Sequence, residues 1–112
     1  MAIRILSDDP AGLLNAIKIG IEQGHVKTWT CDADGDFTHS IPQWNGQAWL
    51  RPTPKDTYLL LNILNRTGAD LSTELYAIFH GRFIEMVLAH FDDRFSKAES
   101  TAMPTNGDHV AG

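Results

Sequence analysis

The middle of the chain, residues 25–52, contains two dipeptides that require tight turns, Asp34-Gly35 and Asn45-Gly46. The favoured two-residue hairpin turns place both central residues at positive φ, which glycine, asparagine and aspartate tolerate best. Around these turns, β-branched, aromatic and polar residues alternate, as they do in half-buried strands. The pattern therefore predicts antiparallel strands. We expect them at residues 26–31, 37–41, 47–51 and, in a more apolar run, 57–64.

Segments with helical spacing of apolar residues lie on both sides of these strands. The first helix is expected from Pro10 to Gln23, with Asp9 as the capping residue and Pro10 at the first helical position, where no amide donor is needed. The second is expected to begin with Ser72 or Asp70 as the capping residue and to run to about residues 91–95. Its apolar stripe is wide enough to predict a mostly buried helix. Gly81 interrupts it at a cost of about 1 kcal/mol relative to alanine, and close approach of another backbone would be a reason for a glycine there.

These elements predict an α+β fold, a two-layer sandwich in which a meander of three or four antiparallel strands packs on the N-terminal and C-terminal helices. Residues 3–6 are expected to form either a short leading strand or an apolar strap over the first helix. We expect a single domain over residues 1–95. Residues 96–112 carry little apolar surface to offset the entropy of ordering, so we expect a flexible C-terminal tail.

The composition limits the classes of function. A chain of 112 residues with a net charge of −5 is one domain, and its acidity argues against binding a nucleic-acid phosphate backbone. No apolar run approaches the roughly 20 residues that a membrane span needs. A single cysteine and the absence of an export signal predict a cytoplasmic protein.

The order of elements resembles that of the double-stranded-RNA-binding domain, in topology only. That family contacts RNA phosphates through basic residues, whereas the final helix here begins Ser72-Thr73-Glu74, so the resemblance implies no RNA function. The run from Tyr76 to Met86 and the block from Asp34 to Trp44 are similar to small uncharacterised bacterial proteins of about this length. That resemblance spans most of residues 10–95 and implies no activity.

The acidic stretch of residues 32–36 resembles the beginning of a calcium-binding EF-hand loop. Such a loop needs glycine at its sixth position and glutamate at its twelfth, where this chain has Phe37 and Gln43. The remaining alternatives are a weak surface cation site and a plain acidic hairpin tip, and the second is the expectation. No metal ligands and no cofactor are predicted.

The histidines show none of the spacings of zinc ligands. The group His80-Gly81-Arg82 would either bind an anion or pair with acidic residues of the sheet, and we expect the pairing because buried polar groups need partners. Cys31 lies beside Asp32 and Asp34, which raise the pKa of a thiol, so a nucleophilic cysteine is not expected. Core positions are expected for two of the three tryptophans, Trp29 and Trp49, and Trp44 is left undecided.

Three functions are carried forward. The leading hypothesis is a small binding or protein-interaction module that forms a homodimer through the final helix or a free sheet edge; it has no catalytic residue. The alternatives are a metal-dependent hydrolase using His39, Asp34 and Asp36, and an acidic protein that sequesters a basic partner. The candidate binding residues are Trp29, Asp34, Asp36, His39, Trp44, Trp49, His80 and Arg82.

Overall fold

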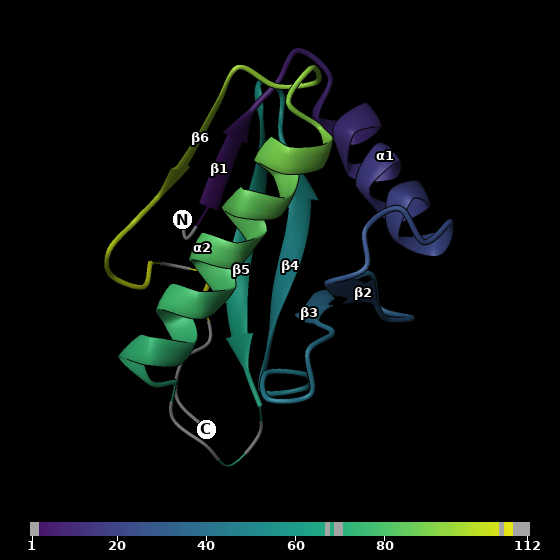
Figure 1. Ribbon diagram of the computed structural model, residues 1–112. Helices are drawn as coiled ribbons and strands as arrows, with labels where there is room; N and C mark the ends of the chain where they lie inside the picture. Colours follow the sequence, from purple (N-terminus) through teal and green to yellow (C-terminus); the bar gives the residue numbers. More distant parts are fainter. Residues whose placement is uncertain (1–2, 67, 69–70, 106, 109–112) are drawn as a thin grey trace.

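The computed structural model describes residues 3–66, 68, 71–105, 107 and 108. Within these residues, two helices pack on one antiparallel sheet of six strands (Figure 1). The elements, in chain order, are β1 (Ile3–Leu6), α1 (Pro10–Glu22), β2 (Trp29–Cys31), β3 (Phe37–His39), β4 (Ala48–Pro54), β5 (Tyr58–Asn65), α2 (Thr73–His90) and β6 (Lys97–Ser100). The α+β class is confirmed, and the predicted number of three or four strands is wrong.

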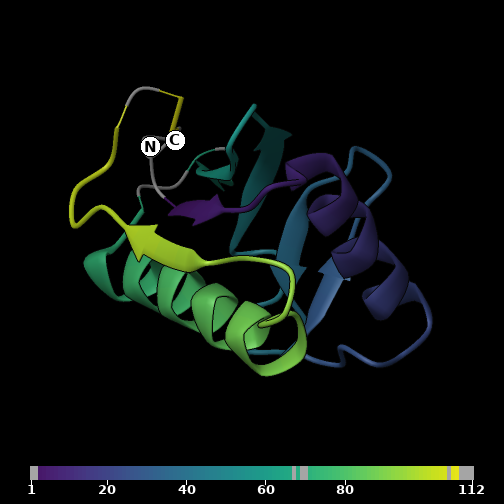
Figure 2. The same cartoon turned by 90° about the horizontal axis from the view of Figure 1, so that it is seen from above.

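The two additional strands come from the ends of the described chain. The sheet order is β2-β3-β4-β5-β1-β6, so β1 lies between β5 and β6. Of the two alternatives for residues 3–6, the strand is therefore the one observed. Strand β6 pairs with β1 from Lys97 to Ser100 (Figure 2), so the prediction of a flexible tail is wrong for these residues. Residue 106 and residues 109–112 of the predicted tail lie outside the described residues.

The first helix begins where the sequence predicts, and Ser72, one of the two predicted capping residues, caps the second. The other, Asp70, lies outside the described residues. The side chain of Asp9 accepts a hydrogen bond from the amide of Gly12, and Pro10 is the first residue of α1. The side chain of Ser72 accepts one from the amide of Leu75 at the start of α2. These caps satisfy amide groups that have no partner inside the helix. No helix among the described residues is both long and apolar enough to cross a membrane.

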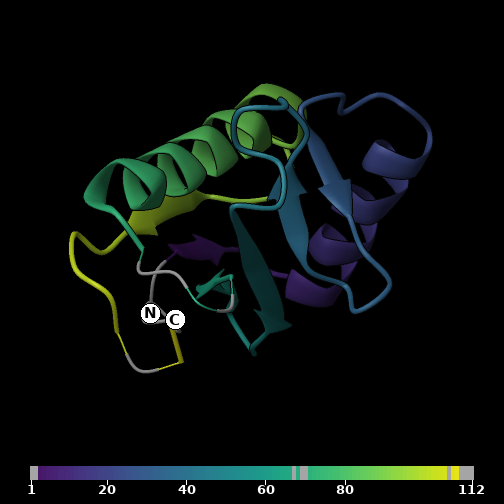
Figure 3. The same cartoon turned by 90° about the horizontal axis from the view of Figure 1, so that it is seen from below.

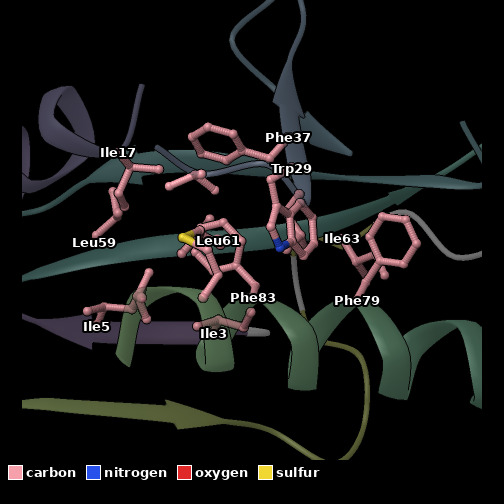
Figure 4. Packing of buried hydrophobic residues seen from close by; sticks show 14 of the residues in the cluster. Ile3, Ile5, Ile17, Trp29, Phe37, Leu59, Leu61, Ile63, Phe79 and Phe83 are labelled. Carbon is pink, nitrogen blue, oxygen red and sulfur yellow. The ribbon is translucent and has the colours of Figure 1, made fainter. Parts of the chain in front are cut away.

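One face of the sheet carries the hydrophobic core. Side chains alternate between the two faces of a strand, and the fully buried ones share a face with both helices: Ile3, Ile5, Leu50, Leu59, Leu61 and Ile63 from the sheet, Leu13 and Ile17 from α1, and Phe79 and Phe83 from α2. Figure 4 shows the indole of Trp29 among these residues. Its ring meets Phe79 and Phe83 edge-on, at centroid distances of 5.7 and 5.2 Å.

Strands β2 and β3 form a short hairpin beside α1, at the end of the sheet opposite β6 (Figure 3). Strand β3 pairs with β4 at a single position, Phe37 opposite Leu50. Beyond Leu50 the strand β4 continues to Pro54, whereas the sequence predicts its end at Arg51. Two prolines fit into this strand because of its register. The nitrogens of Pro52 and Pro54 point away from β5, toward the side where β3 no longer runs alongside, so no hydrogen bond of the sheet is lost.

Candidate functional site

The acidic turn between β2 and β3, residues 32–36, is built from its own side chains. The carboxylate of Asp32 accepts hydrogen bonds from the amides of Asp34 and Asp36, at 3.0 and 2.9 Å. Gly35 has a φ of 85°, whereas Asp34 does not have the positive φ that the predicted two-residue turn also requires, so that turn type is wrong. Oxygens of Asp32, Asp34 and Asp36 lie within 4.8 Å of one another. The turn therefore concentrates three carboxylates at the tip of an exposed hairpin.

Asp36 forms an ion pair with Arg51. Its two oxygens accept from the Nε and an Nη of Arg51 on β4, at 3.0 and 2.8 Å. This bidentate contact raises the pKa of the Arg51 guanidinium. The side chain of Asp36 is 6% exposed, and that of Arg51 is 54% exposed. A cation bound by the acidic turn would have to displace this guanidinium, so the geometry favours the acidic hairpin tip over a cation site.

The ion pair lies on the face of the sheet that the helices leave uncovered, which we call the open face. Register places Trp49 on this face, opposite Leu64, and Leu60 opposite both Thr53 and Arg4. The half-buried apolar side chains of the open face are Leu6, Trp49, Tyr58, Leu60 and Leu64, and none of them belongs to the core cluster. Neither helix packs on them.

Charged residues border this apolar band. At one end is the pair formed by Arg51 and Asp36, and at the other Arg4 pairs with Glu99 of β6. The guanidinium of Arg4 also stands over the ring of Tyr58, 5.2 Å from its centroid. The open face therefore carries apolar side chains on both sides of Asn62, which lies opposite Arg51, and charged pairs at its two ends; Trp49 lies on this face two residues before Arg51. This arrangement is typical of surfaces that bind another protein.

Two of the candidate binding residues belong to the core instead. Trp29 is 1% exposed and His39 is 2% exposed, and their rings are 5.1 Å apart. The Nδ1 atom of His39 accepts a hydrogen bond from the amide of Ile41 at 3.3 Å. Burial lowers the pKa of His39, and the nearby charge of Arg82 lowers it further. The core position predicted for Trp29 is confirmed, and neither side chain is part of a recognition surface.

The candidate metal-dependent site is not assembled. Asp36 and His39 are three residues apart on an extended strand, so their side chains point to opposite faces of the sheet. Asp36 reaches Arg51 on the open face, while His39 packs on Trp29 in the core. Among the described residues, the acidic turn is the group of three potential metal ligands, and it contains no histidine.

The remaining candidates lie apart from one another. Trp44 is half-buried and packs on the edge of the core, whereas Trp49, for which a core position is predicted, is half-buried on the open face. Arg82 is exposed and forms a 3.4 Å pair with Glu85, so the predicted pairing with an acid is made within α2 rather than with the sheet. His80 is 3% exposed and bonds to the backbone carbonyl of Tyr76.

Cys31 is half-exposed, and burial raises the pKa of its thiol while the nearby charge of Lys18 lowers it. The net result is a raised pKa, which makes a poor nucleophile. A groove of about 730 Å³ lies elsewhere, between α1 and the C-terminal end of α2. His25, His90 and Arg94 line it, and none of the candidate binding residues does.

Sequence reasoning missed Arg51 and the leucines of the open face. Arg51 lies 15 residues after its partner Asp36 in the sequence. The alternation of side chains along each strand could have placed both residues on one face, but only with knowledge of the register between β3 and β4. Leu60 and Leu64 belong to the apolar run of residues 57–64, which predicts a strand buried on both faces of the sheet. In the structure, the side chains of this strand on the open face include Leu60 and Leu64, which are half-exposed.

Comparison with known proteins was negative: no protein-family model, no curated protein and no solved structure matches this chain. The resemblance to small uncharacterised bacterial proteins therefore rests on the quoted residues alone.

Proposed function

We propose that this protein is a binding module that recognises another protein through the open face of its sheet and the adjoining acidic turn. The observation that supports the proposal is the position of Trp49, half-exposed on a face that neither helix covers and next to the pair of Arg51 and Asp36. Tryptophan is enriched among residues that contribute most to protein binding. A partner with an apolar patch bordered by basic residues would match this surface.

The charges support a basic partner. The net charge is −5, and two exposed carboxylates of the acidic turn, Asp32 and Asp34, have no salt bridge among the described residues. Opposite charge speeds association and contributes specificity, and its effect weakens as salt is added. We place the protein in the cytoplasm because its only cysteine, Cys31, offers no intramolecular disulfide.

The test is retention of partners from cell extract by the immobilised protein, compared with two variants. Trp49→Asp introduces a charge into the open face, and we expect it to abolish retention. Leu88→Asp is the matched control because Leu88 is 53% exposed on α2, on the helical side of the molecule. It should retain the same partner.

Sedimentation velocity of the protein alone tests whether the partner is a second copy. We expect self-association through the open face to be lost in Trp49→Asp and preserved in Leu88→Asp. A partner that Trp49→Asp retains as well as the unchanged protein, or that resists moderate salt, would contradict the proposal.

A further inference from the structure

The C-terminal strap, residues 101–105, 107 and 108, returns from β6 past α2 toward β5 (Figures 1 and 2). Its first attachment is the hydroxyl of Tyr76 on α2, which donates to the carbonyl of Thr101 at 2.8 Å. The carbonyl of Met103 lies 3.4 Å from the same hydroxyl. One buried tyrosine therefore holds the beginning of the strap against the helix.

The second attachment is Asp108. One oxygen of its carboxylate accepts from the backbone amide of Ile63 at 2.9 Å and from the side chain of Asn62 at 3.0 Å. The other accepts from the amide of Thr105 at 2.7 Å, inside the strap. Within the described residues, the pairing of β1 with β5 ends at Ile3, which faces Leu61. The amide of Ile63 lies beyond this end of β1, and the carboxylate of Asp108 accepts its hydrogen bond as a carbonyl of a neighbouring strand would.

His80 contacts the tyrosine of the first attachment and lies near enough to the second for the charge of Asp108 to act on it. Its ring stacks on that of Tyr76 at a centroid distance of 3.8 Å, and its Nδ1 lies 2.7 Å from the carbonyl of Tyr76. A carbonyl only accepts, so Nδ1 carries the proton and Nε2 of the neutral ring is an acceptor. This Nε2 is buried and has no hydrogen-bond partner among the described residues. The histidine is 3% exposed.

The surroundings of His80 favour its neutral form. Burial lowers its pKa, although the hydrogen bond to Tyr76 and the charge of Asp108 act in the opposite direction. Among the described residues, Asp108 is the charged group that acts on His80, and its oxygens are already bonded to Asn62, Ile63 and Thr105. A proton added to Nε2 would place a charge where burial opposes it.

We propose that the C-terminal strap is a pH-sensitive latch, closed while His80 is neutral and released from α2 and β5 when His80 is protonated. Release would give Nε2 access to water and would free the amide of Ile63, an edge position to which an extended segment of a partner protein can add. The physical basis is linkage: a proton that binds the open form more tightly than the closed form shifts the equilibrium toward the open form.

Hydrogen exchange of individual backbone amides tests the latch. We expect the protection factor of Ile63, corrected for the intrinsic pH dependence of exchange, to fall several-fold between pH 7 and pH 5. The limit is about 25-fold, reached if the closed form binds no proton and the open form has the ordinary histidine pKa of about 6.5. The amide of Ile5, in a strand paired on both sides, reports global unfolding and should remain better protected.

Three variants complete the experiment. His80→Phe keeps a ring to stack on Tyr76 but cannot titrate, so the protection of Ile63 should become independent of pH. His90→Phe changes an exposed histidine of the same helix and should leave the pH response intact. Asp108→Ala should leave Ile63 poorly protected at both pH values. The latch is refuted if Ile63 exchanges as slowly as Ile5 throughout, or if the pH response survives in His80→Phe.

Discussion

His39 and His80 are both buried, and each uses one ring nitrogen in a hydrogen bond with the backbone. Two buried nitrogen atoms of the core, the indole nitrogen of Trp29 and Nε2 of His80, have no hydrogen-bond partner among the described residues. Such groups lose their hydration without compensation, which costs about 1–3 kcal/mol each. At the level of single residues, the core of this protein therefore tolerates neutral histidines and resists charged ones.

Acid should consequently destabilise the fold. Burial lowers the pKa of both His39 and His80 from the ordinary value of 6.5. The unfolded chain then binds more protons than the folded one near that pH, so the free energy of unfolding rises with pH. We expect the full contribution above about pH 7 and a progressive loss below pH 6.5. Urea unfolding at a series of pH values measures this, and an increase in stability on acidification from pH 7 to pH 5 would contradict it.

Gly81 offers a simple gain in stability. It lies inside α2, it is exposed, and a Cβ atom built on it meets no atom within 4 Å. The close approach of another backbone that would explain a glycine here is not found among the described residues. Gly81→Ala should raise the free energy of unfolding by about 0.5–1 kcal/mol, because alanine loses less entropy in a helix. Thermal unfolding checks this, and an unchanged or lower midpoint would contradict it.

At the scale of elements, the junction of β3 with β4 depends on side chains. The two strands are paired at one position, so little backbone hydrogen bonding joins them. The ion pair of Asp36 with Arg51 and the hydrogen bond from Thr38 to the carbonyl of Ala48, at 2.9 Å, supply further connections. The β2–β3 hairpin, which carries the acidic turn, is therefore held to the sheet by polar contacts as much as by its ladder.

Arg51→Met should weaken this junction. The variant keeps an unbranched apolar stem and leaves the carboxylate of Asp36 buried without its partner. We expect a loss of roughly 1–3 kcal/mol, reduced from the value for a fully buried pair because the arginine is half-exposed. The double variant with Asp36→Asn should recover part of the loss, since no uncompensated charge remains. Equal losses in the single and double variants would contradict this account.

The glycines of the two helices differ in their surroundings. A Cβ on Gly20 of α1 would lie 3.1 Å from Phe91 and 3.4 Å from Val26, whereas Gly81 faces open space. Gly20→Ile should therefore destabilise the protein by about 1–3 kcal/mol through overpacking, in contrast to the gain at Gly81. Chemical denaturation of both variants measures the difference. A stable Gly20→Ile variant would show that α1 is not packed closely against Phe91.

At the scale of the whole molecule, the sheet joins distant parts of the chain. Strand β1 pairs with β5, more than 50 residues away, and with β6, more than 90 residues away. Contacts so far apart in sequence form late and slowly during folding. Residues 97–100, predicted as part of a tail, thus form the edge strand of the sheet beside β1.

Glu99→Pro tests how much this edge strand contributes to stability. Glu99 faces Arg4, and the alternation of β1 points the backbone groups of Arg4 toward β6, so a proline at residue 99 removes an amide donor from the ladder between β6 and β1. We expect a loss of about 0.5–1.5 kcal/mol, the net value of one hydrogen bond, together with loss of protection at residues 97–100. Ala102→Pro, just beyond the strand and exposed, is the control. Comparable stability of the two variants would mean that β6 contributes little to the fold.

Local signals alone were sufficient for the helices, for the positive φ of Gly35 and Gly46, and for the approximate positions of β2–β5, but not for the type of turn at either glycine. Caps, tight turns and apolar periodicity act over a few residues, so they can be recognised without knowledge of distant parts. The same signals missed β6. Its sequence, Lys97-Ala98-Glu99-Ser100, carries little apolar surface, and an edge strand needs little, since β1 supplies the hydrogen bonds.

Composition and local pattern by themselves determined the α+β class of this chain, with a central region of antiparallel strands between two helices. Tertiary structure alone decided where each side chain lies: Trp29 and His39 in the core, Trp49 and Asp36 on the open face, and Asp108 of the C-terminal strap bonded to Asn62 and Ile63 of β5. The reason is that a strand presents both faces to its surroundings, and only the placement of helices and neighbouring strands decides which face is buried.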